Sequence, residues 1–162
     1  MLGNVAGRKI VLYTPDYIAV RIRTNGSMLE YADIDGIDAI KVERGIRLDE
    51  YMGRAGAGTA ETKNMLSAFI DFIGDLPLVG YNLDEFGMKI LCRETERIWG
   101  KVPDNEYIDI LQLSKAFIPG LEDYSLETLA QHYEIENFDP YRDMSISRAI
   151  MKIYENLGHE MI

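Results

Sequence analysis

The chain has 162 residues, of which 27 are acidic and 17 are basic, so its formal net charge is −10. This length allows one compact domain, residues 1–162, and leaves little room for a second core of roughly 100 residues. The single cysteine excludes an internal disulfide, and the acidic surplus disfavours binding of nucleic acid by charge alone. Without an apolar run long enough for a signal peptide or a membrane span, we expect a cytoplasmic protein with no membrane partner.

The first third of the chain has the pattern of short strands separated by turns. Apolar or alternating runs occupy residues 9–14, 18–24, 39–43 and 46–51. Asn25-Gly26 is the strongest short hairpin signal among the turns between them, ahead of Arg44-Gly45. We therefore expect a meander of about four antiparallel strands, which begins with an additional N-terminal strand and its lead-in within residues 1–16.

The rest of the chain alternates helical spacing with short apolar strands. The pattern predicts a helix over 61–74 that is ended by glycine, a buried strand over 77–81, and a helix over 84–99. A strand or helix entry follows at 107–113, then a helix over 126–133 capped by Ser125 and a last helix over 144–157 with Gly158 as its stop. This order of elements is typical of an α+β or a mixed α/β fold.

The residues taken by themselves give little evidence for a catalytic site. The two histidines, His132 and His159, belong to no nucleophile motif, and Cys92 falls in an apolar helical stripe where we expect a buried, inert thiol. Acidic pairs such as Asp84 and Glu85 bind Mg²⁺ only if the fold brings several of them together. With 27 carboxylates, a solvated surface is the simpler interpretation of each pair.

Several stretches in a fixed order carry a resemblance to a known family. Residues 77–82 read Pro-Leu-Val-Gly-Tyr-Asn and are followed by Phe-Gly-Met-Lys-Ile-Leu at 86–91. Tyr-Ile-Asp-Ile-Leu stands at 107–111, and Ile-Pro-Gly-Leu and Tyr-Ser-Leu-Glu-Thr-Leu-Ala occupy 118–121 and 124–130. This text resembles the DEDD exonuclease superfamily, in its histidine-type branch that includes the proofreading epsilon subunit of bacterial DNA polymerase III. The resemblance implies a ribonuclease H-like mixed sheet flanked by helices.

The first motif of that family usually reads Asp-x-Glu-Thr-Thr-Gly and is followed by a strand with the text Gly-Ala-Val-Lys-Val-x-x-Gly. Residues 39–45, Ala-Ile-Lys-Val-Glu-Arg-Gly, resemble the second strand. Counting back without a gap places Arg21 and Arg23 on the acidic positions of the first motif. Two arginines two residues apart on a strand project from the same face, where they repel divalent cations.

The resemblance implies a two-metal exonuclease site, but the ligands for it are missing. Family members hold two divalent cations with four carboxylates, and a histidine deprotonates the attacking water. The motif-two aspartate falls on Gly87 if one residue is inserted after Asn82, or on Phe86 if none is. Motif three aligns with Tyr141 at the histidine and Ile146 at the aspartate, so none of the five catalytic residues is present. We expect no cofactor, and Mg²⁺ or Mn²⁺ only if nearby carboxylates, Asp84, Glu85 and Asp143, act as displaced ligands.

The two arginines allow more than one interpretation. In the first interpretation, both side chains face solvent on an alternating hairpin. In the second, they pair with local acids such as Asp84, Glu85 or Asp143. In the third, they bind a phosphate or a partner carboxylate directly. Residues that can contribute to such a ligand site are Arg21, Arg23, Tyr81, Asn82 and Tyr141.

Three functions remain open at this level. The preferred one is a catalytically degenerate exonuclease-fold domain that acts as a binding or assembly module, attached to a replication or repair partner as the resemblance suggests. The second is an active 3′–5′ exonuclease with displaced carboxylates. The third is a nucleic-acid end binder that does not cleave. The sequence sets no oligomeric state.

Overall fold

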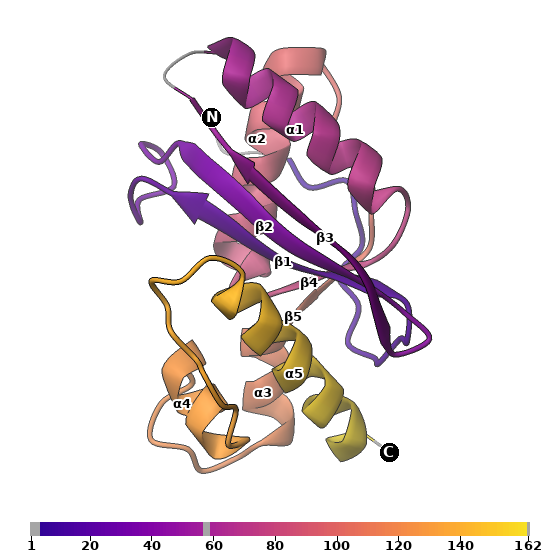
Figure 1. Cartoon of the computed structure of the whole chain (residues 1–162), viewed down its shortest axis with the longest axis vertical. Coiled ribbons are helices and arrows are strands. Elements are labelled where there is room, and N and C mark those ends of the chain that lie inside the picture. Colours follow the sequence, from indigo (N-terminus) through magenta and orange to yellow (C-terminus); the bar gives the residue numbers. More distant parts are fainter. Residues whose placement is uncertain (1–3, 57–58, 162) are drawn as a thin grey trace.

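The computed structural model describes residues 4–56 and 59–161 and contains one five-stranded mixed sheet. The strands run in the order β3-β2-β1-β4-β5, with β1, β2 and β3 antiparallel and β4 and β5 parallel to β1. Figure 1 shows helices α1 and α2 on one side of the sheet and α3, α4 and α5 on the other. The elements are β1 Tyr17–Thr24, β2 Ile34–Glu43, β3 Ile46–Arg54, α1 Thr59–Ile73, β4 Leu78–Gly80, a π-helical turn Leu83–Gly87, α2 Met88–Trp99, β5 Tyr107–Asp109, α3 Ile110–Phe117, α4 Leu126–His132 and α5 Ser145–Glu160.

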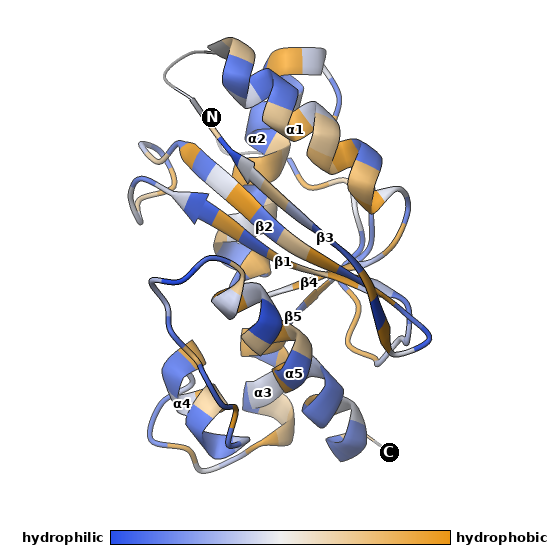
Figure 2. Cartoon of the chain, viewed as in Figure 1, coloured by the Kyte–Doolittle hydropathy of each residue, from blue (hydrophilic) through white to orange (hydrophobic). Residues whose placement is uncertain are grey.

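Helices on both faces explain why the first half of β1 is apolar on both of its sides. Residues 17–20 of β1 are all buried, whereas residues 21–24 at its carboxyl end are only half-buried. Figure 2 shows the same change, from hydrophobic to hydrophilic, toward the arrowhead of β1. Buried side chains form one cluster under α3, α4 and α5 and another under α1 and α2. The predicted ribonuclease H-like α/β arrangement is confirmed.

Most predicted elements are present with small shifts of their bounds. Gly74, with a φ of +53°, follows α1, and the Ser125 hydroxyl accepts a hydrogen bond from the Thr128 amide at the start of α4. Cys92 is buried and unbridged, and burial raises the pKa of its thiol to about 11, which agrees with an inert side chain. Within the described ranges no helix is long and apolar enough to cross a membrane.

The first two predicted connections are different in the structure. Asn25-Gly26 is not a two-residue hairpin turn, because β1 and β2 are joined by a longer loop, residues 25–33. The side-chain oxygen of Asn25 accepts a hydrogen bond from the Asp33 amide and so links the two ends of this loop. Arg44-Gly45 is the two-residue turn, with φ of +54° and +73° as a type I′ turn requires. The predicted N-terminal strand is also wrong: of the described residues before β1, Lys9 alone bridges to β5, at Tyr107.

Gly158 does not end the last helix, which continues to Glu160. A Cβ atom at this position would lie 2.6 Å from Cδ1 of Tyr13, so glycine allows the tyrosine ring to rest against the helix. The same ring stacks on Tyr154, and its hydroxyl donates to Glu155 at 2.7 Å. The glycine therefore serves the packing of the N-terminal segment on α5 rather than helix termination.

Asp109 fixes the turn that leads from β4 into α2. Its buried carboxylate accepts hydrogen bonds from the amides of Asn82, Asp84 and Leu111 at 2.8, 3.0 and 3.0 Å. The Gly87 amide donates to the Asn82 carbonyl, a π-type bond that fits one extra residue into the turn. Burial raises the pKa of Asp109, and the three amides oppose this shift.

We expect Asp109→Ala to lower the free energy of unfolding by about 3 kcal/mol, because it removes a helix cap and leaves two further amides without an acceptor. Denaturant unfolding at neutral pH measures the change. The matched control is Asp104→Ala at an exposed position, for which we expect a change within about 0.5 kcal/mol. Equal losses in the two variants would contradict this role for Asp109.

Candidate functional site

The two motif-one arginines lie on the carboxyl half of β1, on the face covered by α5. Tyr17 and Ala19 on the same strand belong to the cluster under α5, and the alternation of a strand places Arg21 and Arg23 on their side. Arg21 is directly opposite Asp38 of β2. Both guanidiniums donate to the loop before α5, Arg21 to the Pro140 carbonyl and Arg23 to Asp143, which agrees with a common face.

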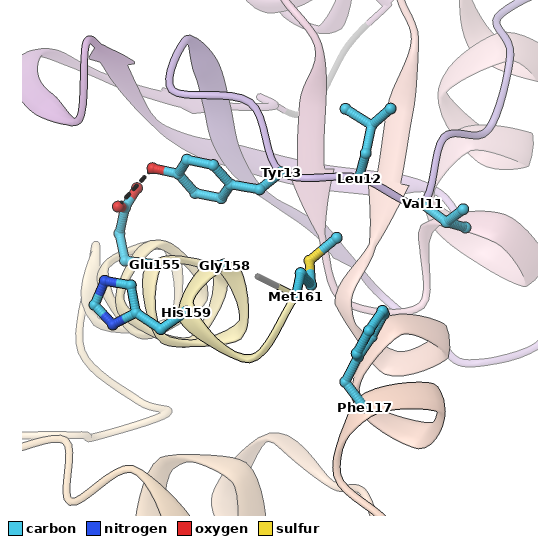
Figure 3. Close-up of a pocket in the computed structure, with 8 residues that line it drawn as sticks. All are labelled: Val11, Leu12, Tyr13, Phe117, Glu155, Gly158, His159 and Met161. Atoms are coloured by element: carbon cyan, nitrogen blue, oxygen red, sulfur yellow. Dashed lines mark hydrogen bonds between the residues drawn. The ribbon is translucent and has the colours of Figure 1, made fainter.

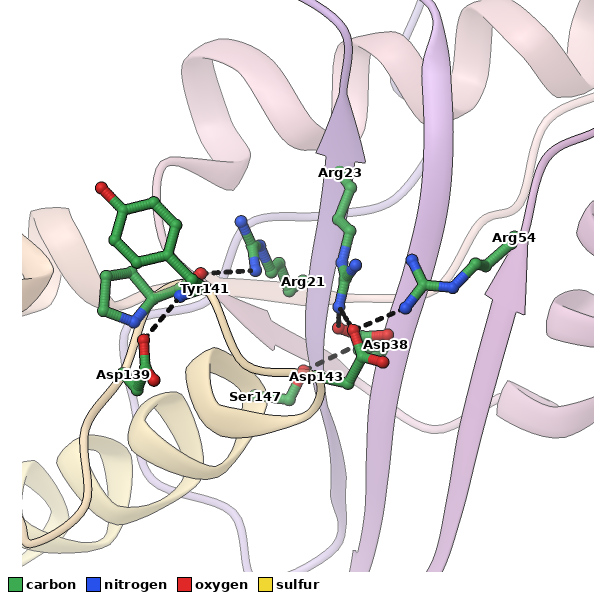
Figure 4. A network of polar contacts seen from close by, with 9 residues as sticks. Arg21, Arg23, Asp38, Arg54, Asp139, Tyr141, Asp143 and Ser147 are labelled. Carbon is green, nitrogen blue, oxygen red and sulfur yellow. Dashed lines mark hydrogen bonds and ion pairs between the residues drawn. The ribbon is translucent and has the colours of Figure 1, made fainter.

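Arg23 is held by two carboxylates. Its Nε and Nη2 atoms donate to Oδ2 of Asp38 at 3.1 and 2.5 Å, and Nη2 also donates to Oδ1 of Asp143 at 2.7 Å (Figure 4). The Asp38 side chain is 2% exposed, and its Oδ1 atom has no hydrogen-bond partner in the described part of the chain. Arg23 therefore supplies the charge that balances a carboxylate buried within the sheet.

Asp143 joins this pair to β3. Its Oδ1 atom also accepts from Nη2 of Arg54 at 2.5 Å. The Arg54 and Arg23 guanidiniums lower the pKa of Asp143 to about 2. The loop before α5 is thus tied to β1 and β3 by one carboxylate.

Arg21 has no such partner. Among the described residues no carboxylate lies within ion-pair distance of it, and the one acceptor of its guanidinium is the Pro140 carbonyl at 3.4 Å (Figure 4). Burial lowers the pKa of Arg21, and the neighbouring charge of Arg23 lowers it further. Of the two predicted ligand arginines, one is therefore neutralised and one keeps free donors.

The side chain of Arg21 lines a cavity of about 170 Å³ between the carboxyl ends of β1 and β4 and the helices α4 and α5. The other motif positions, Gly87 and Ile146, line the same cavity, as does Phe86. The π-helical turn accommodates one extra residue after Asn82, which favours Gly87 as the motif-two position. The remaining walls are mostly apolar and comprise Val20, Ile22, Tyr81, Leu83, Leu126 and Ile150.

Other predicted site residues are placed differently. The Tyr81 hydroxyl donates to the Tyr124 carbonyl at 2.7 Å, and Asn82 is bound through its amide to Asp109. Tyr141 is 96% exposed and does not line the cavity that Arg21 lines. Its amide donates to Asp139 in the loop before α5.

The three fallback carboxylates do not converge. Asp84 accepts from Lys9 and from the Tyr107 hydroxyl, both at 2.9 Å. Glu85 is exposed and lies 3.9 Å from Lys89, whereas Asp143 is held by arginines. Within residues 4–56 and 59–161 there is no group of three acidic, cysteine or histidine side chains arranged to hold a metal ion.

A larger cavity, of about 460 Å³, lies at the other end of α5 between Val11, Phe117 and His159 (Figure 3). None of the predicted site residues lines it. Its carboxylate, Glu155, accepts from the hydroxyls of Tyr13 and Tyr17 and so is used in packing. The smaller cavity is therefore the candidate site, since three of the motif positions, Arg21, Gly87 and Ile146, line it.

Two members of the network, Asp38 and Arg54, are not among the residues predicted from the sequence. A signal for Asp38 existed, since it stands where the family text before Ala39 carries glycine. Arg54 gave no signal, because its contact with Asp143 depends on how β3 and the loop before α5 meet.

Comparisons with known proteins now identify the family. A family model described as RNase T exonuclease matches residues 54–143, more than half of the chain. The chain belongs to this exonuclease family. The resemblance to DEDD exonucleases noted in the sequence is thereby confirmed.

Relatives of this exonuclease-family chain include DNA polymerase III proteins. The chain is 22% identical to DNA polymerase III subunit epsilon of Aquifex aeolicus, over 90% of this chain and 81% of that protein. It is 26% identical to the PolC-type DNA polymerase III of Halalkalibacterium halodurans, over 82% of this chain but 11% of that protein. Exonuclease I of E. coli in complex with a dT13 oligonucleotide shares the fold, with a TM-score of 0.66 and 16% identity over 89% of this chain and 41% of that one.

We expect Arg23→Met to lower the free energy of unfolding by about 3 kcal/mol, because it leaves the Asp38 carboxylate buried without a counter-charge. The matched control is Arg54→Met. Its side chain is 53% exposed and pairs with an accessible carboxylate, so we expect a loss of at most about 1 kcal/mol. Guanidinium or urea unfolding of the three proteins measures both. Indistinguishable losses would show that the buried pair does not stabilise the fold.

The two arginines around Asp143 also set its titration. We expect the Asp143 carboxyl to titrate at about pH 2 in the native chain and at a higher pH in Arg54→Met, followed by carboxyl ¹³C shifts. Because its pKa is lowered on folding, the stabilisation is complete above the ordinary value near 3.8 and is lost as the pH falls through about 2. Arg47→Met, on the same strand but paired with Glu50, serves as the control and should leave this titration unchanged. An unchanged pKa in Arg54→Met would argue against the contact.

Proposed function

We propose that this exonuclease-family chain has lost metal-dependent 3′–5′ hydrolysis and acts as a binding or assembly module. The observation that carries the proposal is the Arg23 side chain at a motif-one ligand position, where it is bound to Asp38 and Asp143. The guanidinium of Arg23 places a fixed positive charge in the space where active members of the family hold metal cations.

The residues at the four ligand positions do not fit a pair of Mg²⁺ ions. Mg²⁺ requires several hard oxygen ligands in nearly octahedral geometry. Arg21 and Arg23 repel a cation, and Gly87 and Ile146 carry no side-chain oxygen. We therefore assign no hydrolytic step to this site and expect no resident metal.

The kind of partner is suggested by the relatives. They are a subunit and PolC-type chains of DNA polymerase III, and the structural neighbours are exonuclease I molecules, some in complex with oligonucleotides. A protein partner from the replication or repair machinery fits an assembly role. The net charge of −10 opposes tight, non-specific association with DNA.

A second candidate function is a nucleic-acid end binder that does not cleave. The free donors of Arg21 favour it, because a guanidinium fork binds phosphate well. An active exonuclease would require Asp84, Glu85 and Asp143 as ligands. Asp84 and Asp143 are already engaged by Lys9 and by the arginines, which disfavours that alternative.

We expect no release of mononucleotides from a labelled single strand in the presence of Mg²⁺ or Mn²⁺, measured by gel or chromatography at high protein concentration. E. coli exonuclease I under the same conditions is the positive control. The double variant Asp84→Asn with Asp143→Asn is the background control for contaminating nuclease. Turnover by the native chain that this double variant abolishes would overturn the proposal.

A further inference from the structure

The cavity beside Arg21 combines one free cation with apolar walls. Ile22, Leu83, Ile146 and Ile150 contribute hydrocarbon, and the half-buried Arg21 contributes the charge. Its guanidinium has five donors, of which one makes a long bond to the Pro140 carbonyl. Its other donors make no hydrogen bond to the described residues and can bind an acceptor that a ligand carries. The cavity is therefore suited to an anion that also carries an apolar group.

The charged residues around the cavity determine how much negative charge a ligand should carry. In the network of Figure 4, the carboxylates of Asp38 and Asp143 balance Arg23 and Arg54. Asp139 accepts from the Tyr141 amide and forms no ion pair with Arg21. One guanidinium therefore remains for the ligand, which matches a monoanion such as a carboxylate better than a phosphomonoester.

The volume of the cavity limits the apolar group. About 170 Å³ is well below the 300–1,000 Å³ of typical sites for ligands of drug size, so the cavity encloses a single small group and not a whole nucleotide. A comparable apolar cavity of roughly 150 Å³ accommodates a group the size of benzene. One branched aliphatic side chain has a volume suited to such a cavity. Tyr81 is not free to rotate over a base without losing its bond to the Tyr124 carbonyl.

We propose that this cavity binds the C-terminal carboxylate of a protein partner that ends in an aliphatic residue. At a chain end the carboxylate and the side chain branch from one Cα atom, so one residue can meet Arg21 and the apolar walls together. The carboxylate would receive the Arg21 donors and replace the long bond to Pro140, while the side chain displaces water from the cavity. This inference rests on the proposed function, because it names the partner contact of an assembly module.

The test uses the full chain and a hexapeptide that ends in Leu, with either a free carboxylate or a C-terminal amide. Binding is measured by calorimetry and by methyl shifts of Ile146 and Ile150. We expect the free acid to bind at least about tenfold more tightly than the amide, since a charge-assisted pair is lost. Arg21→Met should cause a similar loss, and the matched variant Arg54→Met should bind the acid as the native chain does.

Equal affinity for acid and amide, or no methyl shifts at millimolar peptide, would overturn the inference. The inference would also be overturned if 4-methylpentanoate alone bound as tightly as the peptide, since the ligand of the cavity would then be a small molecule. Tighter binding of dTMP with shifts of the same methyl groups would overturn it as well. The unfolding curve of Arg21→Met is first compared with that of the native chain. A loss of binding that is caused by misfolding is recognised in this way. Failure here leaves the loss of hydrolysis untouched, which the nuclease assay decides separately.

Discussion

The ion pair between Arg23 and Asp38 is the interaction on which the arrangement of the cleft depends. Asp38 lies between β1 and β3 in the sheet, and a carboxylate buried there requires a counter-charge. Arg23 supplies it and binds Asp143 with the same nitrogen, so two strands and the loop before α5 are held by one guanidinium. Relative to the family text, position 23 has gained a positive charge and position 38 a negative one. An acid restored at position 23 alone would face Asp38, so the two changes depend on each other.

The fold could be predicted from the sequence wherever local chemistry decides the outcome. The periodicity of 61–74, the Ser125 cap and the apolar stretch of β4 each need contacts only within a few residues, and all three elements are present. The errors come from long-range contacts. Asn25 bonds to Asp33 rather than closing a tight turn, and Gly158 is small because Tyr13, far away in the chain, packs on it.

The candidate site was predictable in part for the same reason. The period of a strand places Arg21 and Arg23 on one face, and the family text brings Gly87 and Ile146 to their cavity. The pair of Arg23 with Asp38 depends on the register of β1 and β2, and the contacts of Arg23 and Arg54 with Asp143 depend on where the loop before α5 lies. No feature of the sequence separates the paired arginine from the free one, because the difference lies in the position of the loop before α5.

The net charge of −10 and the free guanidinium act at different distances, and this resolves their apparent conflict. At physiological ionic strength, charges are screened beyond about 8 Å, so the acidic surplus mainly sets how polyanions approach the surface. At contact in the cavity, mostly apolar side chains surround Arg21, and a ligand that covers them lowers the local dielectric and strengthens the attraction to Arg21. A nucleic-acid strand must bring many phosphates close to the acidic surface to place one in the cavity. A single carboxylate at a chain end brings one negative charge. It is attracted by Arg21 and is only weakly repelled by the acidic surface.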